Sequence, residues 1–198
     1  AEKVGPFSVA EHGTYARPWA IAFEPTTGNV FITEKAGAIK FFQPANGKLG
    51  TVSGVPEVDY GGQGGLGDIA FAPDYAESGM VYLSWAEAGE NDTRGAAVGR
   101  GKLVCEDHDS CDIRDLSVIW RQAPKTSGRG HYSHRIAFSP AGDYLYVASG
   151  DRQKMQPAQD NKNTIGTIVR LNLDGTPAAG NPMMADGSPA NEIWSYGH

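Results

Sequence analysis

A histidine and an aspartate near the middle of the chain have the types and the spacing for proton transfer. His131 precedes a short apolar segment at residues 136–138, and Asp151 follows a second one at residues 144–149. If the two segments pair as an antiparallel hairpin, the two side chains lie at the same end of it and can meet. A histidine beside a carboxylate can act as an oriented general base. The alternative is a polar loop residue, because His–Asp contacts also occur in structural networks.

An internal repeat indicates which elements position this pair. The motif Ile-Ala-Phe-x-Pro begins at Ile21, Ile69 and Ile136, and a polar turn and an aromatic or β-branched run follow each copy. The starts lie 48 and 67 residues apart. Repeats of about 40–50 residues built from short strands are typical of β-propeller blades. The longer second interval leaves room for an insertion, which we place around Cys105 and Cys111.

The repeats predict an all-β chain that forms one propeller domain. The approximate blades are residues 15–60, 61–125 and 126–198. The predicted strands are 19–23, 29–33 and 38–42, then 67–71, 80–87, 97–104 and 117–122, then 134–138, 144–149, 167–171 and 192–196. Propellers have about four to eight blades, and a partial ring leaves two blade faces uncovered. We therefore expect an incomplete domain, the N-terminal part of a longer protein.

A glycine-rich segment adds a third polar side chain to the same region. Gln63 has two glycines on each side, and glycine permits positive φ and close backbone approach. No helix pattern follows, so the segment is not a dinucleotide- or phosphate-binding loop. Gln63 precedes the first strand of its repeat as His131 precedes the first strand of the next. The repeat thus predicts that both side chains and Asp151 face one central funnel; the alternative is a flexible connecting loop.

Composition and charge narrow the functional class. The 198 residues carry a formal net charge of -6, with 26 glycines and 12 prolines, which is typical of short strands joined by many turns. An acidic chain argues against nucleic-acid binding, because phosphates require clustered Lys and Arg. No apolar run is long enough to span a bilayer. No signal peptide is present, and because numbering starts at Ala1 we expect a mature form whose leader has been removed.

The two cysteines allow three interpretations. Cys105 and Cys111 lie six positions apart around an acidic turn, a spacing that a disulfide across a hairpin tip can close. Such a bond suits an oxidising compartment. A zinc site would require two more ligands, of which only His108 is nearby. The third interpretation is a pair of unrelated, reduced cysteines. The spacing favours the disulfide.

Several short segments spread over nearly the whole chain, taken together, match one pattern. They are residues 17–23 (RPWAIAF), 33–37 (TEKAG), 62–66 (GQGGL), 70–74 (AFAPD), 131–135 (HYSHR), 150–151 (GD), 158–160 (AQD), 169–175 (VRLNLDG) and 192–198 (EIWSYGH). In this order they resemble the soluble, pyrroloquinoline-quinone-dependent aldose dehydrogenases, the glucose/sorbosone dehydrogenase family. The resemblance implies a six-bladed β-propeller, of which this chain supplies about the first three blades.

The resemblance also implies a reaction and assigns roles. Members are quinoproteins that oxidise the C1 hydroxyl of aldose sugars to lactones by hydride transfer to pyrroloquinoline quinone. His131 corresponds to the general base, which also contacts the cofactor, and Asp151 to the carboxylate that orients it. Gln63 corresponds to a glutamine that hydrogen-bonds the cofactor. Gln156 and Gln159 follow in the next loop and are expected to contact sugar hydroxyls.

Further expectations follow from the same resemblance. A calcium ion is expected to polarise the quinone; its ligands are expected beyond residue 198, because the present sequence names none. The expected partners are a small-molecule sugar and an artificial or respiratory electron acceptor, with no nucleic acid and no membrane span, and a homodimer is left open. Members are typically periplasmic or secreted, which agrees with a disulfide.

Two positions depart from the family pattern, and two other function classes stay open. Thr167 stands where lysine is common, and His134 where glycine is common. His134 could compete as the base, bind a metal with His131, or fill space, and we favour the last; Arg135 is expected to be structural.

The alternative functions are those of a non-catalytic propeller that binds a partner and of a metal-dependent lactonase-type hydrolase. The lactonase would need a central cluster of carboxylates, and the fold alone does not decide function.

Overall fold

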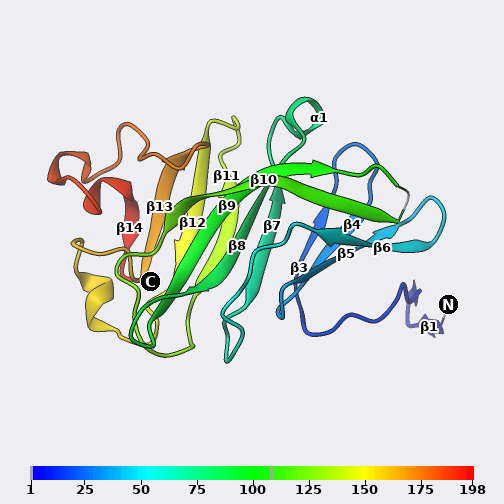
Figure 1. Ribbon diagram of the computed structural model, residues 1–198, viewed down its shortest axis with the longest axis horizontal. Helices are drawn as coiled ribbons and strands as arrows, with labels where there is room; N and C mark the ends of the chain where they lie inside the picture. The colour runs from blue at the N-terminus through cyan, green and yellow to red at the C-terminus, as the bar shows by residue number, and fades with distance from the viewer. Residues whose placement is uncertain (1, 108) are drawn as a thin grey trace.

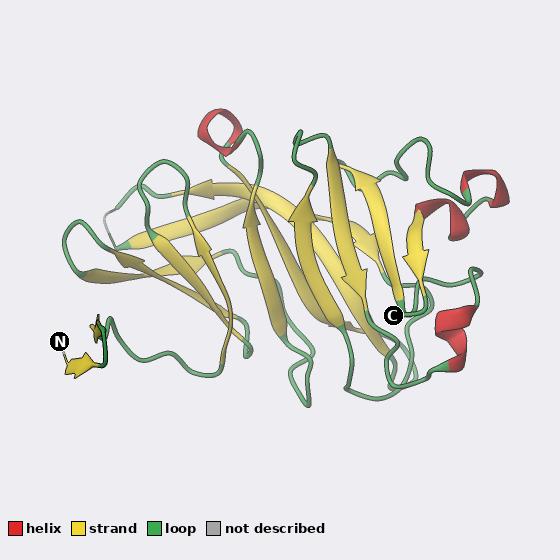
Figure 2. Cartoon of the chain, turned by 180° about the vertical axis from the view of Figure 1, so that it is seen from behind, coloured by secondary structure: helices red, strands yellow, loops and turns green. Residues whose placement is uncertain are grey.

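The computed structural model describes residues 2–107 and 109–198 as strands joined by turns and a few short helices (Figure 1). The strands are β1 (Glu2–Val4), β2 (Phe7–Val9), β3 (Pro18–Phe23), β4 (Val30–Glu34), β5 (Ala38–Gln43), β6 (Lys48–Ser53), β7 (Leu66–Phe71), β8 (Met80–Ala88), β9 (Arg94–Val104), β10 (Ser110–Arg121), β11 (Ser133–Phe138), β12 (Tyr144–Ser149), β13 (Thr167–Asn172) and β14 (Ile193–Tyr196). The helical segments are α1 (Tyr75–Ser78), η1 (Gln156–Gln159), η2 (Met184–Asp186) and η3 (Ala190–Glu192). The predicted all-β class is confirmed, and the helical turns lie at the edges of the strand body (Figure 2).

Each repeat of the sequence forms four antiparallel strands. We call β3–β6 unit one, β7–β10 unit two and β11–β14 unit three. The Ile-Ala-Phe motif lies in the first strand of each unit and the run after the turn forms the second. The first strands of neighbouring units contact each other, β3 against β7 and β7 against β11. Closure into a ring and the number of blades stay predictions.

The outer edges of units one and two are joined, which the sequence did not predict. β10 runs parallel to β6, pairing Cys111 with Val52, so the sheet order is β3-β4-β5-β6-β10-β9-β8-β7. β6 is not among the predicted strands, and its segment KLGTVS buries only Gly50 and Val52. β10 also begins earlier than predicted, at Ser110. The backbone pairing with β10 holds β6 in the sheet, although β6 has almost no apolar pattern of its own.

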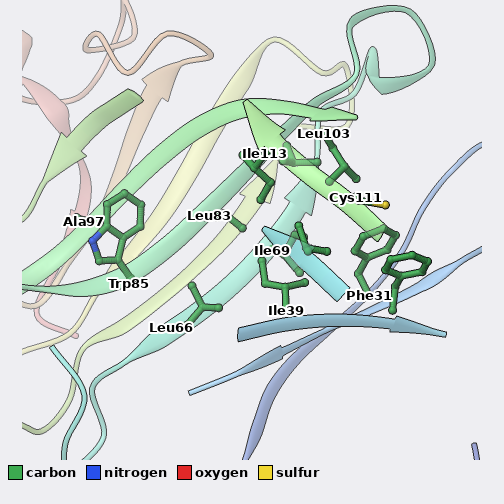
Figure 3. Close-up of a cluster of buried hydrophobic side chains, with 13 residues drawn as sticks. Phe31, Ile39, Leu66, Ile69, Leu83, Trp85, Ala97, Leu103, Cys111 and Ile113 are labelled. Carbon is green, nitrogen blue, oxygen red and sulfur yellow. The ribbon is translucent and has the colours of Figure 1, made fainter. Parts of the chain in front are cut away.

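Buried side chains pack units one and two together, and units two and three. The first cluster draws on β4, β5, β7 and β8, with Phe31, Ile39 and Leu83 among its members (Figure 3). The second joins Tyr82 of β8 to strands of unit three. Successive residues of a strand point to opposite faces, so Tyr82 and Leu83 serve different clusters. Unit two is therefore apolar on both faces, which explains the imperfect alternation in its sequence.

The first hairpin of every unit carries an irregularity at the same place. Register shifts fall between Pro18 and Ile21, between Leu66 and Ile69, and between Ser133 and Ile136. Bulges of this kind redirect side chains and recur beside functional sites. The redirected residues include Trp19, Gly67 and His134, which meet at the candidate site.

The predicted disulfide between Cys105 and Cys111 is present. Cys111 is buried in the cluster between units one and two, whereas Cys105 is exposed. The bond therefore ties the exposed turn after β9 to the strand that pairs with β6. His108, the third ligand of the alternative zinc site, lies outside the described residues.

Replacing both cysteines with serine is expected to lower the free energy of unfolding by about 2 kcal/mol, because the short closed loop no longer restricts the unfolded chain. Denaturant titration of the wild type and of the double variant measures the difference. Reduced wild type, prepared with a thiol reagent, serves as the control and should match the variant. Equal unfolding midpoints for oxidised and reduced wild type would contradict the expectation.

Candidate active site

A hollow of about 540 Å³ opens where loops from all three units converge. Its lining residues are Trp19, Lys35, Gln63, His131, Tyr132, Ser133, His134, Gly150, Asp151 and His198. The structure thus places Gln63, His131 and Asp151 together, at the position that the repeat indicated. Their chemical roles stay predictions.

His131 and Asp151 form a hydrogen-bonded pair at this hollow. The Nδ1 atom of His131 lies 2.7 Å from Oδ1 of Asp151. The histidine side chain is 51% exposed and the aspartate side chain 19%. A carboxylate at Nδ1 favours the tautomer with the proton on that nitrogen, which leaves the lone pair of Nε2 free to accept a proton. The pair therefore has the arrangement of an oriented base with one accessible nitrogen.

Asp151 is held ionised by its own loop. Its Oδ1 also accepts a hydrogen bond from the backbone N–H of Gln153 at 3.0 Å. Burial raises the pKa of Asp151, but the hydrogen bonds from Gln153 and His131 outweigh it, and the net pKa lies below the ordinary value of 3.8. The carboxylate is therefore a permanent acceptor for His131 over the physiological pH range.

Three loops interlock around this pair. The backbone N–H of His131 donates to Oε1 of Gln63 at 2.7 Å, and the N–H of Gly150 donates to the Tyr132 carbonyl at 3.0 Å. A Cβ at Gly150 would collide with the His131 carbonyl oxygen, so this close approach requires glycine. Gln63 therefore ties unit two to the loop that carries the histidine.

The same loops hold non-glycine residues in left-handed backbone conformations. His131, Ser133 and His134 have φ between 44° and 58°, and Arg152 and Gln153 have φ of 55° and 58°. Such conformations cost free energy and persist where the surrounding contacts determine them, commonly at functional sites. The strain in these two loops coincides with the His131–Asp151 pair.

His134 fills space and does not compete as a base. Its side chain is 1% exposed, its ring lies 5.2 Å from the ring of Trp19, and its Nδ1 lies 3.2 Å from Ser84 Oγ. It occupies the room left by Gly67, where a Cβ would collide with the imidazole. Burial, reinforced by nearby arginine charges, lowers the pKa of His134 from 6.5 to about 3. The ring is therefore neutral at physiological pH.

Arg135 has structural partners, as expected. Its guanidinium forms an ion pair with buried Asp68 at 3.0 Å and lies 4.7 Å from the centre of the Trp19 ring. Asp68 also accepts the backbone N–H of Ile136 at 2.8 Å. This set of contacts links units one, two and three at Trp19, which lines the hollow.

Trp19 and Lys35 line the hollow, although the sequence had indicated only packing between blades for Trp19 and no role for Lys35. Lys35 directly follows β4, the second strand of unit one, and its Nζ donates to the Gly62 carbonyl at 2.7 Å. Asp151 occupies nearly the same place after β12, the second strand of unit three. The residue after the second strand of each repeat was therefore a usable signal for Lys35.

Gln156 and Gln159 do not line this hollow. Gln156 begins η1 and lines a separate hollow of about 720 Å³, together with Lys154 and Lys162. Gln159 ends η1 with its Nε2 close to Gly197, where a Cβ would lie 3.3 Å away. Gln159 is thus near the C-terminal edge of the site and Gln156 is not. Their contacts with a sugar stay predictions.

The described residues contain neither a metal-binding cluster nor a membrane-spanning helix. Within residues 2–107 and 109–198, no group of three or more His, Cys, Asp or Glu side chains is placed to hold a metal ion. In the same ranges, no helix is both long and apolar enough to cross a membrane. No metal ligand is therefore assigned to a residue of this chain.

Comparisons with known proteins agree on one family. Residues 15–198 match the family described as Glucose / Sorbosone dehydrogenase. The chain is 38% identical to the aldose sugar dehydrogenase YliI of Escherichia coli (strain K12) over 180 residues, which are 91% of this chain and 47% of that protein. The chain spans about half the length of the relatives it matches.

Solved structures give the same result. A crystal structure of a glucose dehydrogenase superimposes with a TM-score of 0.86 at 37% identity, covering 93% of this chain and 52% of that one. The PQQ-bound form of an aldose sugar dehydrogenase from Streptomyces coelicolor gives a TM-score of 0.77 at 30% identity, with coverages of 93% and 52%. These similarities extend over all three units.

Proposed function

The chain belongs to the glucose/sorbosone dehydrogenase family, and on this premise we propose that it is part of a quinoprotein that oxidises aldose sugars. The substrate is the C1 hydroxyl of the sugar, the product is the lactone, and the hydride acceptor is pyrroloquinoline quinone. The observation that carries the proposal is the His131–Asp151 pair, which lines the shared hollow with Gln63.

The side chains that line the hollow fit such a cofactor. Pyrroloquinoline quinone is flat and carries carboxylates, and the hollow offers the Lys35 ammonium, the Gln63 amide and the Trp19 ring. An ammonium pairs with carboxylates, an amide donates to carbonyl oxygens, and an indole packs on a planar ring. The volume of about 540 Å³ lies within the usual range for small-molecule sites. We therefore assign cofactor contacts to Lys35, Gln63 and His131.

The residues of this chain supply the proton chemistry. When bound, the quinone accepts the hydride from C1 of the sugar. Nε2 of His131 takes the proton of the C1 hydroxyl, so that the carbonyl bond can form as the hydride leaves. Asp151 keeps the proton on Nδ1 and stabilises the imidazolium that results. Gln63 holds the backbone of His131 in place through the bond to its N–H.

The remaining parts of the proposal concern the full-length protein. We propose that it closes as a six-bladed β-propeller and that it uses calcium with the quinone, with an artificial or respiratory acceptor reoxidising the cofactor. A periplasmic or secreted location is supported by the Cys105–Cys111 disulfide, because such bonds persist in oxidising compartments. Whether two copies associate is left to solution measurement.

Reconstitution of the protein at its full natural length tests the proposal. Pyrroloquinoline quinone and calcium are added, and dye reduction is followed with a panel of aldoses. We expect turnover that requires the quinone and is absent with 1,5-anhydroglucitol, which lacks the C1 hydroxyl. If neither turnover nor quinone binding by calorimetry is found, the dehydrogenase assignment is wrong.

A further inference from the structure

The guanidinium of Arg152 is buried beneath the loop that carries His131. The side chain is 1% exposed and is among the largest fully buried side chains of the described residues. Every hydrogen-bond partner that the structure gives its guanidinium is an uncharged oxygen. The bonds run from Nε to the Gly130 carbonyl at 2.8 Å, from Nη1 to the Arg94 carbonyl at 2.8 Å and to Gln122 Oε1 at 3.3 Å, and from Nη2 to the Gly128 carbonyl at 2.6 Å.

Arg152 contacts the residues on either side of His131 in the chain. The residue before it, Gly130, accepts a hydrogen bond from the guanidinium, and the ring of the residue after it, Tyr132, lies 3.7 Å from Cζ of Arg152. The backbone N–H of Arg152 donates to the His131 carbonyl at 3.2 Å. Arg152 also directly follows Asp151 in the chain. One residue therefore fixes the backbone of the histidine and that of its carboxylate partner.

Burying the charge of Arg152 costs free energy, which indicates that its contacts serve a function. Burying a charge is expensive unless it is paired, and burial lowers the pKa of Arg152, in keeping with this cost. The planar fork of an arginine can bind several carbonyl oxygens at fixed angles, which a lysine cannot do. In addition, the Arg152 guanidinium contacts unit two, because it donates to the backbone carbonyl of Arg94. The side chain of Arg94 is itself paired with Asp59, at 2.7 Å.

We propose that Arg152 is a positioning residue that fixes the orientation of the His131–Asp151 pair. Being buried, it touches neither sugar nor cofactor and acts through the loop backbone. The catalytic part of this inference rests on the proposed sugar oxidation, whereas the orientation of the pair can be measured without it. The required property is the shape of the guanidinium, so retaining the positive charge alone should not preserve the function.

The test compares Arg152→Lys and Arg152→Met with a matched control, Arg170→Lys, in the full-length protein. Arg170 is also buried, at 9% exposure. Its guanidinium bonds Asn181 Oδ1 at 2.7 Å and lies 4.2 Å from the Trp194 ring. It does not line the hollow. We expect both Arg152 variants to lose about 100-fold in kcat with KM changed less than about threefold, because a small displacement of a catalytic group costs this much. The control should retain kcat.

A second readout is independent of turnover. In protein with ¹⁵N-labelled histidine, the wild type should show a sharp Nδ1–H resonance for His131, assigned by its loss in His131→Gln. This resonance should broaden or vanish in both Arg152 variants and persist in Arg170→Lys. If the wild type oxidises no sugar, the proposed function fails while the resonance still decides the positioning role.

Two results would overturn the inference. One is an Arg152→Lys protein with the kcat and the His131 Nδ1–H resonance of the wild type, which would show that a positive charge is sufficient and the shape of the guanidinium is not required. The other is an equal loss in Arg170→Lys, which would indicate general destabilisation. Should both Arg152 variants fail to fold, Gln122→Leu removes one acceptor of the guanidinium and should weaken the resonance. Because the Gln122 amide also donates to Ser149 Oγ and to the Gly150 carbonyl, Ser149→Ala serves as the control and should leave the resonance sharp. An unchanged resonance in that variant would contradict the proposal.

Discussion

Replacement of His131 with alanine is expected to lower kcat for aldose oxidation by about 10³-fold. General base catalysis by a positioned side chain typically contributes 10²–10⁴-fold, and His131 pairs with Asp151 at the hollow through Nδ1. The loss should appear in kcat more than in KM, because the proton is transferred only in the transition state. Steady-state kinetics of the reconstituted full-length protein measure both constants.

A matched histidine provides the control for this experiment. His12 is exposed, packs against Phe42 at 4.5 Å and is not among the residues that line the hollow. His12→Ala should retain wild-type kcat. A His131→Ala protein that binds quinone and keeps kcat within about threefold of wild type would show that another group is the base.

Replacement of Asp151 with asparagine is expected to lower kcat by about 10²- to 10³-fold. The amide has nearly the same shape, but its NH₂ group can donate to Nδ1 of His131. The imidazole then carries its proton on Nε2 and can no longer accept one from the sugar. Quinone affinity, measured by calorimetry, should change little, because the structure places Asp151 against His131 and its own loop. A variant with wild-type kcat would contradict the orienting role.

The depressed pKa of Asp151 also predicts a pH dependence of stability. Because the folded-state pKa lies below the ordinary 3.8, the ionised carboxylate stabilises the folded protein. This contribution is fully present above pH 3.8 and is lost as the pH falls through the folded-state pKa. The difference in unfolding free energy between wild type and Asp151→Asn should therefore be constant near neutral pH and shrink in acid. A difference that grows on acidification would have the wrong sign.

Much of the fold was determined locally and could be predicted from the sequence. The Ile-Ala-Phe-x-Pro repeat identified the first strand, the turn and the second strand of each unit, because alternating apolar residues and turn residues encode these elements directly. The hairpin β11–β12 then brought His131 and Asp151 together, since the ends of an antiparallel pair are neighbours by geometry. The disulfide followed from a short spacing that one turn can close.

Other features depended on contacts between units. β6 has almost no apolar pattern, and its place is determined by edge pairing with β10. Three roles stayed open for His134 in the sequence, with space-filling favoured, and only Gly67 of the neighbouring unit makes the room in which its ring is buried. Gln156 followed Asp151 closely in sequence, yet η1 carries it to another hollow.

The sequence by itself therefore determined most of the strands, their repeat and the meeting of His131 with Asp151, because each depends on residues close together along the chain or at the two ends of one hairpin. Only the tertiary structure decided which side chains surround that pair. Lys35 and Trp19 come from unit one, Gln63 from unit two, and the partners of Arg152 from units two and three. Their meeting depends on how apolar faces pack between units, and no spacing within a single repeat encodes that packing.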